Sequence, residues 1–148
     1  MGGWTITWQG KTWEGTSISN QDFPNTQSIF DSISENVLMS GGSVEYSDDG
    51  SYDQKPDVVI FIYGETPYAE GEGDITSLDF SPKNKNILKV MKKISKDGIP
   101  MVSLFISGRP LIVDQELNLS DAFVSLWLPG TAVELSLIHI SEPTRLRS

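Results

Sequence analysis

One apolar run constrains the fold of this 148-residue chain more than any other feature. Residues 57–63 are centred on the run VVIFI, which contains β-branched and aromatic residues and no polar residue. A continuous run of this length predicts a strand, and it suits a parallel strand whose two faces are both covered. The sequence therefore predicts a buried strand here, and the acidic, glycine-rich loop that follows the strand has to start at its carboxyl end.

The remaining segments alternate between helical and strand patterns. Apolar residues at helical spacing predict helices over 26–37 and 84–96, and Gly98 is a suitable residue to follow the end of the second helix. Apolar runs predict strands over 100–107 and 122–128, with a short helix between them. Shorter strands are expected at 4–8 and 43–46, and at 111–113 as a strand or a continuation. This order predicts an α/β fold, a three-layer αβα sandwich with a mostly parallel sheet.

Composition excludes several classes of function. The net charge of −9 argues against nucleic acid or an anionic membrane surface as a partner. The chain has no cysteine, and its single histidine is His139, so we expect neither a metal site nor a cofactor. Residues 47–51 lack the closing glutamate of a calcium loop and are predicted to be a turn. No apolar run approaches the roughly 20 residues that a membrane helix needs, and no signal peptide is visible.

The loop after the first strand carries most of the chemistry that the sequence offers. Its stretch IYGETPYAEGEGD, residues 62–74, contains four carboxylates: Glu65, Glu70, Glu72 and Asp74. In parallel sheets ligands bind beyond the carboxyl ends of the strands, where residues 108–110 and 129–130 are also expected. A nucleophile elbow is absent, and Gly71 and Gly73 do not open a helix as a dinucleotide loop requires. Carboxylate acid–base chemistry remains, although such a loop is more often a solvated connection.

The last residues do not belong to the predicted domain. Residues 135–145, LSLIHISEPTR, match the in-frame translation of a transposase sequencing adapter. We therefore expect residues 1–134 to form the domain and residues 135–148 to be a non-native tail, in which His139 has no function.

Five separated blocks resemble one family. They are GGWTITWQG at 2–10, DFP at 22–24, IYGETPYAEGEGD at 62–74, LFISGRPLIV at 104–113 and AFVSLWLPGTAVE at 122–134. In this order they are similar to the C-terminal αβα domain of family 3 glycoside hydrolases, the β-glucosidase and exo-β-glucanase branch. The resemblance implies that a (β/α)8 barrel precedes the domain and supplies an Asp nucleophile. It also implies that this copy of the domain is incomplete at its C-terminal end.

The resemblance assigns roles to individual residues. Glu70 matches the acid/base position, with Glu65 as the second choice, and Trp8 matches a tryptophan that stacks on the sugar. Tyr68 either contacts substrate or fixes the shape of the loop. The remaining matches have supporting roles: Glu65 again, Asp74, and Arg109, which either pairs with the carboxylates or caps the sheet edge.

The implied function is that of a fragment of a retaining, exo-acting β-glucosidase or β-glucanase. It would take β-glucans or β-glucosides, release glucose from non-reducing ends, and need the barrel domain as its partner but no cofactor. We expect the isolated chain to be inactive, because the nucleophile lies outside it. The parent would be periplasmic or secreted by analogy with the family. The alternative is a stand-alone carbohydrate-binding or protein-interaction module.

Overall fold

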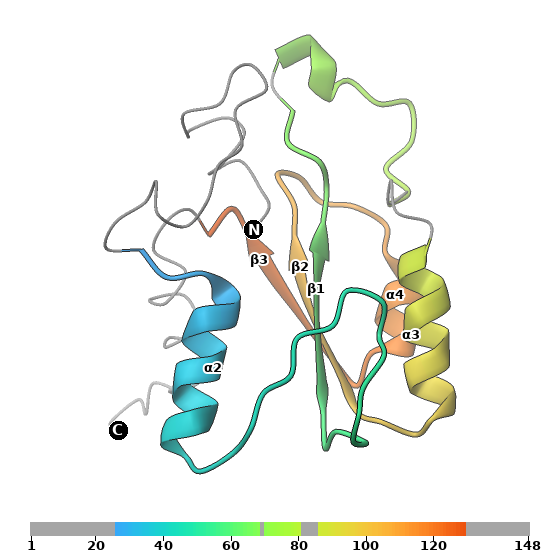
Figure 1. The fold of residues 1–148 in the computed structure, drawn as a ribbon. Helices are drawn as coiled ribbons and strands as arrows, with labels where there is room; N and C mark the ends of the chain where they lie inside the picture. Colours follow the sequence, from blue (N-terminus) through green and yellow to red (C-terminus); the bar gives the residue numbers. More distant parts are fainter. Residues whose placement is uncertain (1–25, 69, 81–85, 130–148) are drawn as a thin grey trace, which may run out of the picture.

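The computed structural model describes residues 26–68, 70–80 and 86–129, and it contains three strands and four helical segments (Figure 1). The predicted strand at 4–8 and the predicted tail lie outside the described residues. In chain order the elements are α2 (Ile29–Met39), β1 (Val59–Gly64), the 3-10 helix η2 (Glu70–Gly73), α3 (Asn86–Lys96), β2 (Met101–Ile106), α4 (Asp114–Leu119) and β3 (Ala122–Trp127).

The strands form one parallel sheet in the order β1-β2-β3. The pairing of β1 with β2 runs from Val59 opposite Met101 to Gly64 opposite Ile106 without a break. The pairing of β2 with β3 contains an irregularity between Phe105 and Ile106, so that Ile106 lies opposite Trp127. Viewed along the sheet, α2 lies on one side and α3 and α4 lie on the other (Figure 1). The prediction of an αβα arrangement with a parallel sheet is confirmed.

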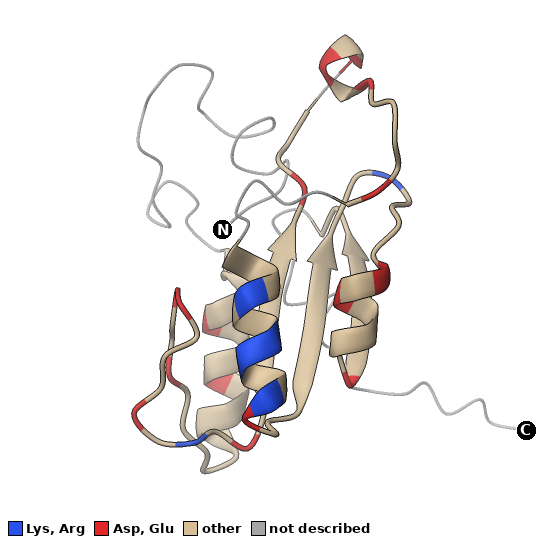
Figure 2. Ribbon diagram, turned by 90° about the vertical axis from the view of Figure 1, so that its right-hand side faces the viewer, with Lys and Arg blue, Asp and Glu red and all other residues tan. Residues whose placement is uncertain are grey.

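The face of the sheet covered by α3 holds the most deeply buried residues. Met91 and Ile94 of α3 are almost fully buried and pack with Ile99 and Met101, with Phe61 and Leu119 at the margin of the cluster. The four lysines of α3 are all exposed and recur along the helix, where the ribbon is blue (Figure 2). Gly98 has a φ of +65° and follows the helix, as the sequence predicts, because glycine adopts this conformation without a steric penalty.

The opposite face is covered only in part. A capping box starts α2: the Asp31 amide donates to Ser28 Oγ at 3.1 Å, and the Ser28 amide donates to the Asp31 carboxylate at 3.2 Å. Ile29 of α2 packs on Leu104, Ile106 and Leu126, which belong to β2 and β3.

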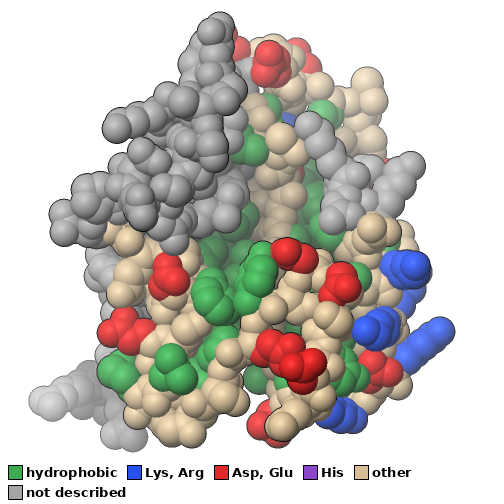
Figure 3. All heavy atoms as spheres, in the orientation of Figure 1, with side chains coloured by type: hydrophobic (Ala, Val, Ile, Leu, Met, Phe, Trp, Pro, Cys, Tyr) green, Lys and Arg blue, Asp and Glu red, His purple; other side chains and the backbone are tan. Residues whose placement is uncertain are grey.

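Of the described helices, none covers β1 on the α2 side, where Val58, Ile60 and Ile62 are 45%, 38% and 41% exposed. Figure 3 shows hydrophobic side chains at the surface between α2 and the edge of the sheet. The prediction that both faces of this strand are covered is therefore wrong, because α2 lies over β2 and β3 and does not reach β1.

Two predicted strands and one turn have clear outcomes. Residues 43–46 have no strand structure, so that prediction is wrong. Of residues 111–113, only Ile112 forms a bridge, and its partner is Asp79. The predicted turn at 47–51 is confirmed, with the Ser51 amide donating to the Asp49 carboxylate at 2.9 Å.

In the described part of the chain, no helix is long and apolar enough to cross a membrane.

A tyrosine lies inside the aromatic cluster at the carboxyl end of the sheet. The Tyr63 ring packs 5.5 Å from the ring of Phe105 and 6.0 Å from that of Phe80. Its hydroxyl is buried without a hydrogen-bond partner among the described residues, and the nearby Ser103 hydroxyl pairs with Ser120 at 2.6 Å. Burial raises the pKa of Tyr63 to about 12.

Alkaline titration tests this environment. An unfolded phenol ionises near pH 10, so the stability that Tyr63 contributes is complete below about pH 10 and is lost as the pH rises through about 12. We expect one phenolate absorbance step near pH 12 after a rapid pH jump, and we expect this step to be missing from Tyr63→Phe. At neutral pH, removing the unpaired hydroxyl should raise the free energy of unfolding by about 1 kcal/mol. Tyr46→Phe is the exposed control. A wild-type titration without the late step would contradict this description.

Candidate functional site

The acidic loop rises from the carboxyl edge of the sheet. The Glu65 amide donates to the Ile106 carbonyl at 3.0 Å, directly after β1 pairs with β2. The Ser107 amide likewise donates to the Trp127 carbonyl at 3.2 Å. From this edge the chain extends above the strands, carries η2 at its tip, and returns toward α3 (Figure 1). The loop therefore starts at a rigid part of the molecule, where ligands of parallel sheets bind.

Glu65 anchors the base of the loop. Its Oε2 accepts from the Ser107 hydroxyl at 3.0 Å and from the Gly108 amide at 3.2 Å. Its Oε1 accepts from Arg109 Nε at 3.1 Å, an ion pair whose two side chains are 18% (Arg109) and 12% (Glu65) exposed. Both oxygens of Glu65 are therefore occupied by donors that follow β2. Charge-assisted hydrogen bonds of this kind are among the stronger ones in proteins, especially when partly buried.

Arg109 also holds the far end of the loop. Its Nη1 donates to the carbonyl oxygen of Gly73, the last residue of η2. The centre of its guanidinium group lies 3.7 Å from the centroid of the Tyr68 ring, a cation–π contact. The Tyr68 ring in turn lies so close to Gly73 that a Cβ on Gly73 would approach its Cδ2 at 2.5 Å. Arg109, Tyr68 and Gly73 thus form a stack that closes the loop on itself.

Tyr68 has a raised pKa for reasons visible in this stack. Burial raises the pKa of its phenol, the negative charge of Glu65 raises it further, and the Arg109 guanidinium opposes both. The ring therefore stays neutral at physiological pH and keeps its electron-rich face toward Arg109. This position favours the role of fixing the shape of the loop, which the sequence left open beside substrate contact.

Glu70 lies at the exposed tip. It begins η2, its side chain is exposed, and its φ of +46° places it in the left-handed region. The Asp74 amide donates to the Gly71 carbonyl at 3.2 Å and closes the short helix. The side chain of Asp74 is also exposed. The stack of Arg109, Tyr68 and Gly73 thus holds a turn whose Glu70 side chain is exposed.

The structure brings three of the predicted site residues into contact: Glu65, Tyr68 and Arg109. Glu70 and Asp74 share the same loop, and Trp8 lies outside the described residues. Two further participants were not singled out from the sequence. Ser107 is almost fully buried and binds Glu65, and Gly73 provides space for Tyr68. The position of Ser107 directly after a buried strand, two residues before Arg109, was the signal available for it.

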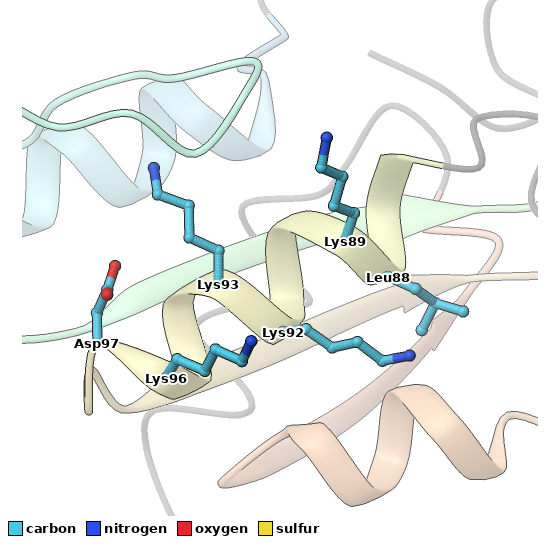
Figure 4. Close-up of a pocket in the computed structure, with 6 residues that line it drawn as sticks. All are labelled: Leu88, Lys89, Lys92, Lys93, Lys96 and Asp97. Atoms are coloured by element: carbon cyan, nitrogen blue, oxygen red, sulfur yellow. The ribbon is translucent and has the colours of Figure 1, made fainter.

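A separate hollow of about 600 Å³ lies on the outer face of α3 and is lined by Leu88, Lys89, Lys92, Lys93, Lys96 and Asp97 (Figure 4). Lys93 donates to the Gly50 carbonyl at 3.0 Å and lies 5.6 Å from the centroid of the Tyr52 ring. It therefore fixes the segment before β1. Within the described ranges, no group of three or more His, Cys, Asp or Glu side chains could hold a metal ion.

Comparisons with known proteins give the family of the chain. The model of the glycosyl hydrolase family 3 C-terminal domain matches residues 1–140. The lysosomal beta glucosidase of Dictyostelium discoideum is 29% identical over 141 residues, which cover 88% of this chain and 17% of that protein.

Two crystal structures of an exo-1,3/1,4-beta-glucanase, ExoP from a Pseudoalteromonas species, are similar as well. The native enzyme gives a TM-score of 0.78 and a point mutant gives 0.79, each with 47% sequence identity and 92% of this chain covered. The chain covers 16% and 21% of those two chains, so it spans only a small part of each relative. With a family model that matches nearly the whole sequence and this parallel αβα fold, the chain belongs to the glycosyl hydrolase family 3 C-terminal domain family.

Proposed function

We propose that this chain is the acid/base half of a retaining, exo-acting β-glucosidase or β-glucanase. In this proposal an N-terminal barrel supplies an Asp nucleophile, and the loop at residues 65–74 supplies the proton donor, Glu70. The observation that supports it best is the braced loop: Arg109 holds the loop at Glu65, Tyr68 and Gly73, while Glu70 stays exposed between the last two.

The hydrogen bonds separate the two candidate acids. Both oxygens of Glu65 accept bonds from the Ser107 hydroxyl, the Gly108 amide and Arg109, all of which are donors. These bonds tie the Glu65 side chain to the residues that follow β2, so its carboxyl group is engaged in holding the loop. Within the part of the chain that the structure describes, Glu70 makes no such bonds, and its side chain is exposed. This supports Glu70 as the acid/base group and Glu65 as the residue that ties the loop to the sheet.

The chemistry follows from two carboxyl groups. In retaining glycosidases these groups lie about 5–5.5 Å apart, one attacking the anomeric carbon while the other protonates the leaving oxygen. Glu70 would give its proton to the glycosidic oxygen in the first step. In the second step the same carboxylate would remove a proton from the water that hydrolyses the glycosyl–enzyme intermediate. An exposed group on a braced loop is suited to this task, because the substrate would be bound against the nucleophile of another domain.

The names of the relatives support the substrate class. They are a beta glucosidase and an exo-1,3/1,4-beta-glucanase. We extend this class to the present chain: glucose would be released from the non-reducing ends of β-glucans or β-glucosides. Trp8 would stack on the sugar, since aromatic faces suit the apolar face of a pyranose. Asp74 would support the end of η2 through its backbone.

The test uses the full-length gene product that contains this chain. We expect the adjoining gene sequence to encode the barrel. We expect the full-length protein to hydrolyse an aryl β-glucoside and a β-glucan, with the β-anomer of glucose appearing first in proton NMR spectra. The 148-residue chain alone should show no turnover, because it lacks the nucleophile.

Four outcomes would contradict the proposal. Adjoining sequence without a barrel, or glucan binding by the isolated chain with no hydrolysis by any longer product, would favour the stand-alone binding module. Release of the α-anomer first would refute the retaining mechanism. Turnover by the isolated chain, abolished by Glu70→Gln, would show that the nucleophile lies within it.

A further inference from the structure

We infer that Arg109 is a positioning residue for the acid/base step, acting through Glu70 by holding both ends of the turn that carries it. The inference rests on the proposed function of Glu70. It adds a third component to the two carboxyl groups: a cation whose role is to fix where the proton donor lies.

Arg109 contacts the loop at three points along its length. At the base it pairs with Glu65, in the middle it stacks on Tyr68, and at the end it binds the Gly73 carbonyl. Glu70 lies between the second and the third of these points. Because the two residues that bound this short turn contact one guanidinium group, the place of the turn above the sheet depends on that group.

Arg109 is itself fixed to the sheet. It follows β2 by three residues, and its amide donates to the Ser107 hydroxyl at 3.1 Å. Ser107 is almost fully buried and also binds Glu65. The path from the sheet to the turn is therefore short: β2, Ser107, Arg109, and then Tyr68 and Gly73. A path with so few flexible bonds can hold a side chain to the precision that proton transfer needs.

The contacts require a guanidinium group rather than any cation. Nε donates to Glu65 while Nη1 donates to Gly73, and the guanidinium group lies against the Tyr68 ring. A lysine ammonium is a compact point charge that cannot donate in two fixed directions and stack at the same time. Arg109→Lys therefore keeps the positive charge but cannot make the contacts with Glu65, Gly73 and Tyr68 at the same time.

Gly73 offers an independent way to disturb the same stack. An alanine at this position would place its Cβ 2.5 Å from Cδ2 of Tyr68, so the ring would have to leave its present position against Arg109. The substitution leaves the positive charge of Arg109 and the carboxyl groups of Glu65 and Glu70 unchanged. Gly71 lies in the same 3-10 helix, and a methyl group there would meet nothing within 4 Å, which makes Gly71→Ala the matched control.

The experiment compares Arg109→Lys, Gly73→Ala, Gly71→Ala and Lys92→Ala in the full-length enzyme. We expect the first two to lower kcat on alkyl β-glucosides by about 10- to 100-fold while KM changes less than threefold, an effect of lost positioning rather than lost binding. The loss in kcat/KM, which reports the first step, should shrink for a dinitrophenyl leaving group, because that group needs no proton. Gly71→Ala and Lys92→Ala should keep wild-type kcat. A purely structural role would lower kcat for all leaving groups in proportion to the fraction unfolded.

A double-mutant cycle decides whether Arg109 acts through Glu70. The Arg109→Lys, Glu70→Gln double variant should be no slower than Glu70→Gln alone, because the residue that Arg109 positions has lost its function. Additive losses, or equal losses for every leaving group, would overturn the inference while leaving Glu70 as the acid. Wild-type activity of Glu70→Gln would instead overturn the proposed function. Gly73→Ala provides the same cycle if Arg109→Lys does not fold.

Discussion

Replacing Glu70 with glutamine is expected to lower kcat/KM of the full-length enzyme on alkyl β-glucosides by about 10²- to 10⁴-fold, the usual contribution of a general acid. Glutamine keeps the size of the side chain but cannot donate a carboxyl proton. The leaving alkoxide then departs without protonation, and its high basicity makes this step slow. The first step with a dinitrophenyl glucoside should be much less affected, because that leaving group departs readily as an anion.

The second step provides a further signature of this variant. Without a general base, water attacks the glycosyl–enzyme intermediate slowly, so the intermediate should accumulate. Azide needs no deprotonation, and its addition should restore turnover and give a β-glucosyl azide. Glu72→Gln is the matched control, because Glu72 is exposed in the same 3-10 helix. A Glu65→Gln variant that shows the leaving-group dependence and azide rescue, with Glu70→Gln active, would reverse the assignment.

Gly64→Ala is expected to reduce the free energy of unfolding by about 3 kcal/mol, at the upper end of what overpacking costs. A Cβ at Gly64 would overlap the Ile106 carbonyl oxygen and lie 2.8 Å from the carbonyl carbon. These are backbone atoms of β2, so no side chain can move aside. The same carbonyl accepts the Glu65 amide at 3.0 Å. The substitution should therefore separate β1 from β2 at the point where the acidic loop begins.

Urea-induced unfolding followed by tryptophan fluorescence measures this effect. Gly71→Ala serves as the control, because a methyl group there meets nothing within 4 Å. A surface substitution of this kind should change the free energy of unfolding by less than about 0.5 kcal/mol. Equal stabilities of the two variants would show that β1 and β2 do not approach each other as closely as described.

The sequence predicted the sheet and its helices well because the patterns are local. The spacing of Ile87, Val90, Met91 and Ile94 defines one face of α3, and two of these residues are among the most buried. The apolar runs predicted β1, β2 and β3 to within two residues at each end. The exposed face of β1 was not predicted, because an apolar run reads the same whether one or both faces are covered. That difference depends on where α2 packs, which is a tertiary property.

The site was predicted as a set of residues rather than as an arrangement. Family resemblance pointed to Glu70 as the acid/base residue, with Glu65 as the second choice, while the roles of Tyr68 and Arg109 remained open. Arg109 meets Glu65 and Gly73 across 44 and 36 positions of sequence, and no local pattern encodes such contacts. The packing of Tyr68 against Gly73 explains why a glycine stands there, and it is visible only in three dimensions. The contacts give each residue a separate place: Glu65 ties the loop to the sheet, Arg109 holds both ends of the turn, and Glu70 is exposed.

The backbone of Glu70 has a consequence for how this loop can vary among relatives. At a φ of +46°, a residue with a side chain folds less favourably than glycine, by roughly 1 kcal/mol. Stability alone would therefore favour glycine at this position, and in the proposed mechanism the need for a proton donor retains glutamate. A relative that has lost its catalytic activity would be free to exchange Glu70 for glycine or asparagine, and its domain would become more stable as a result.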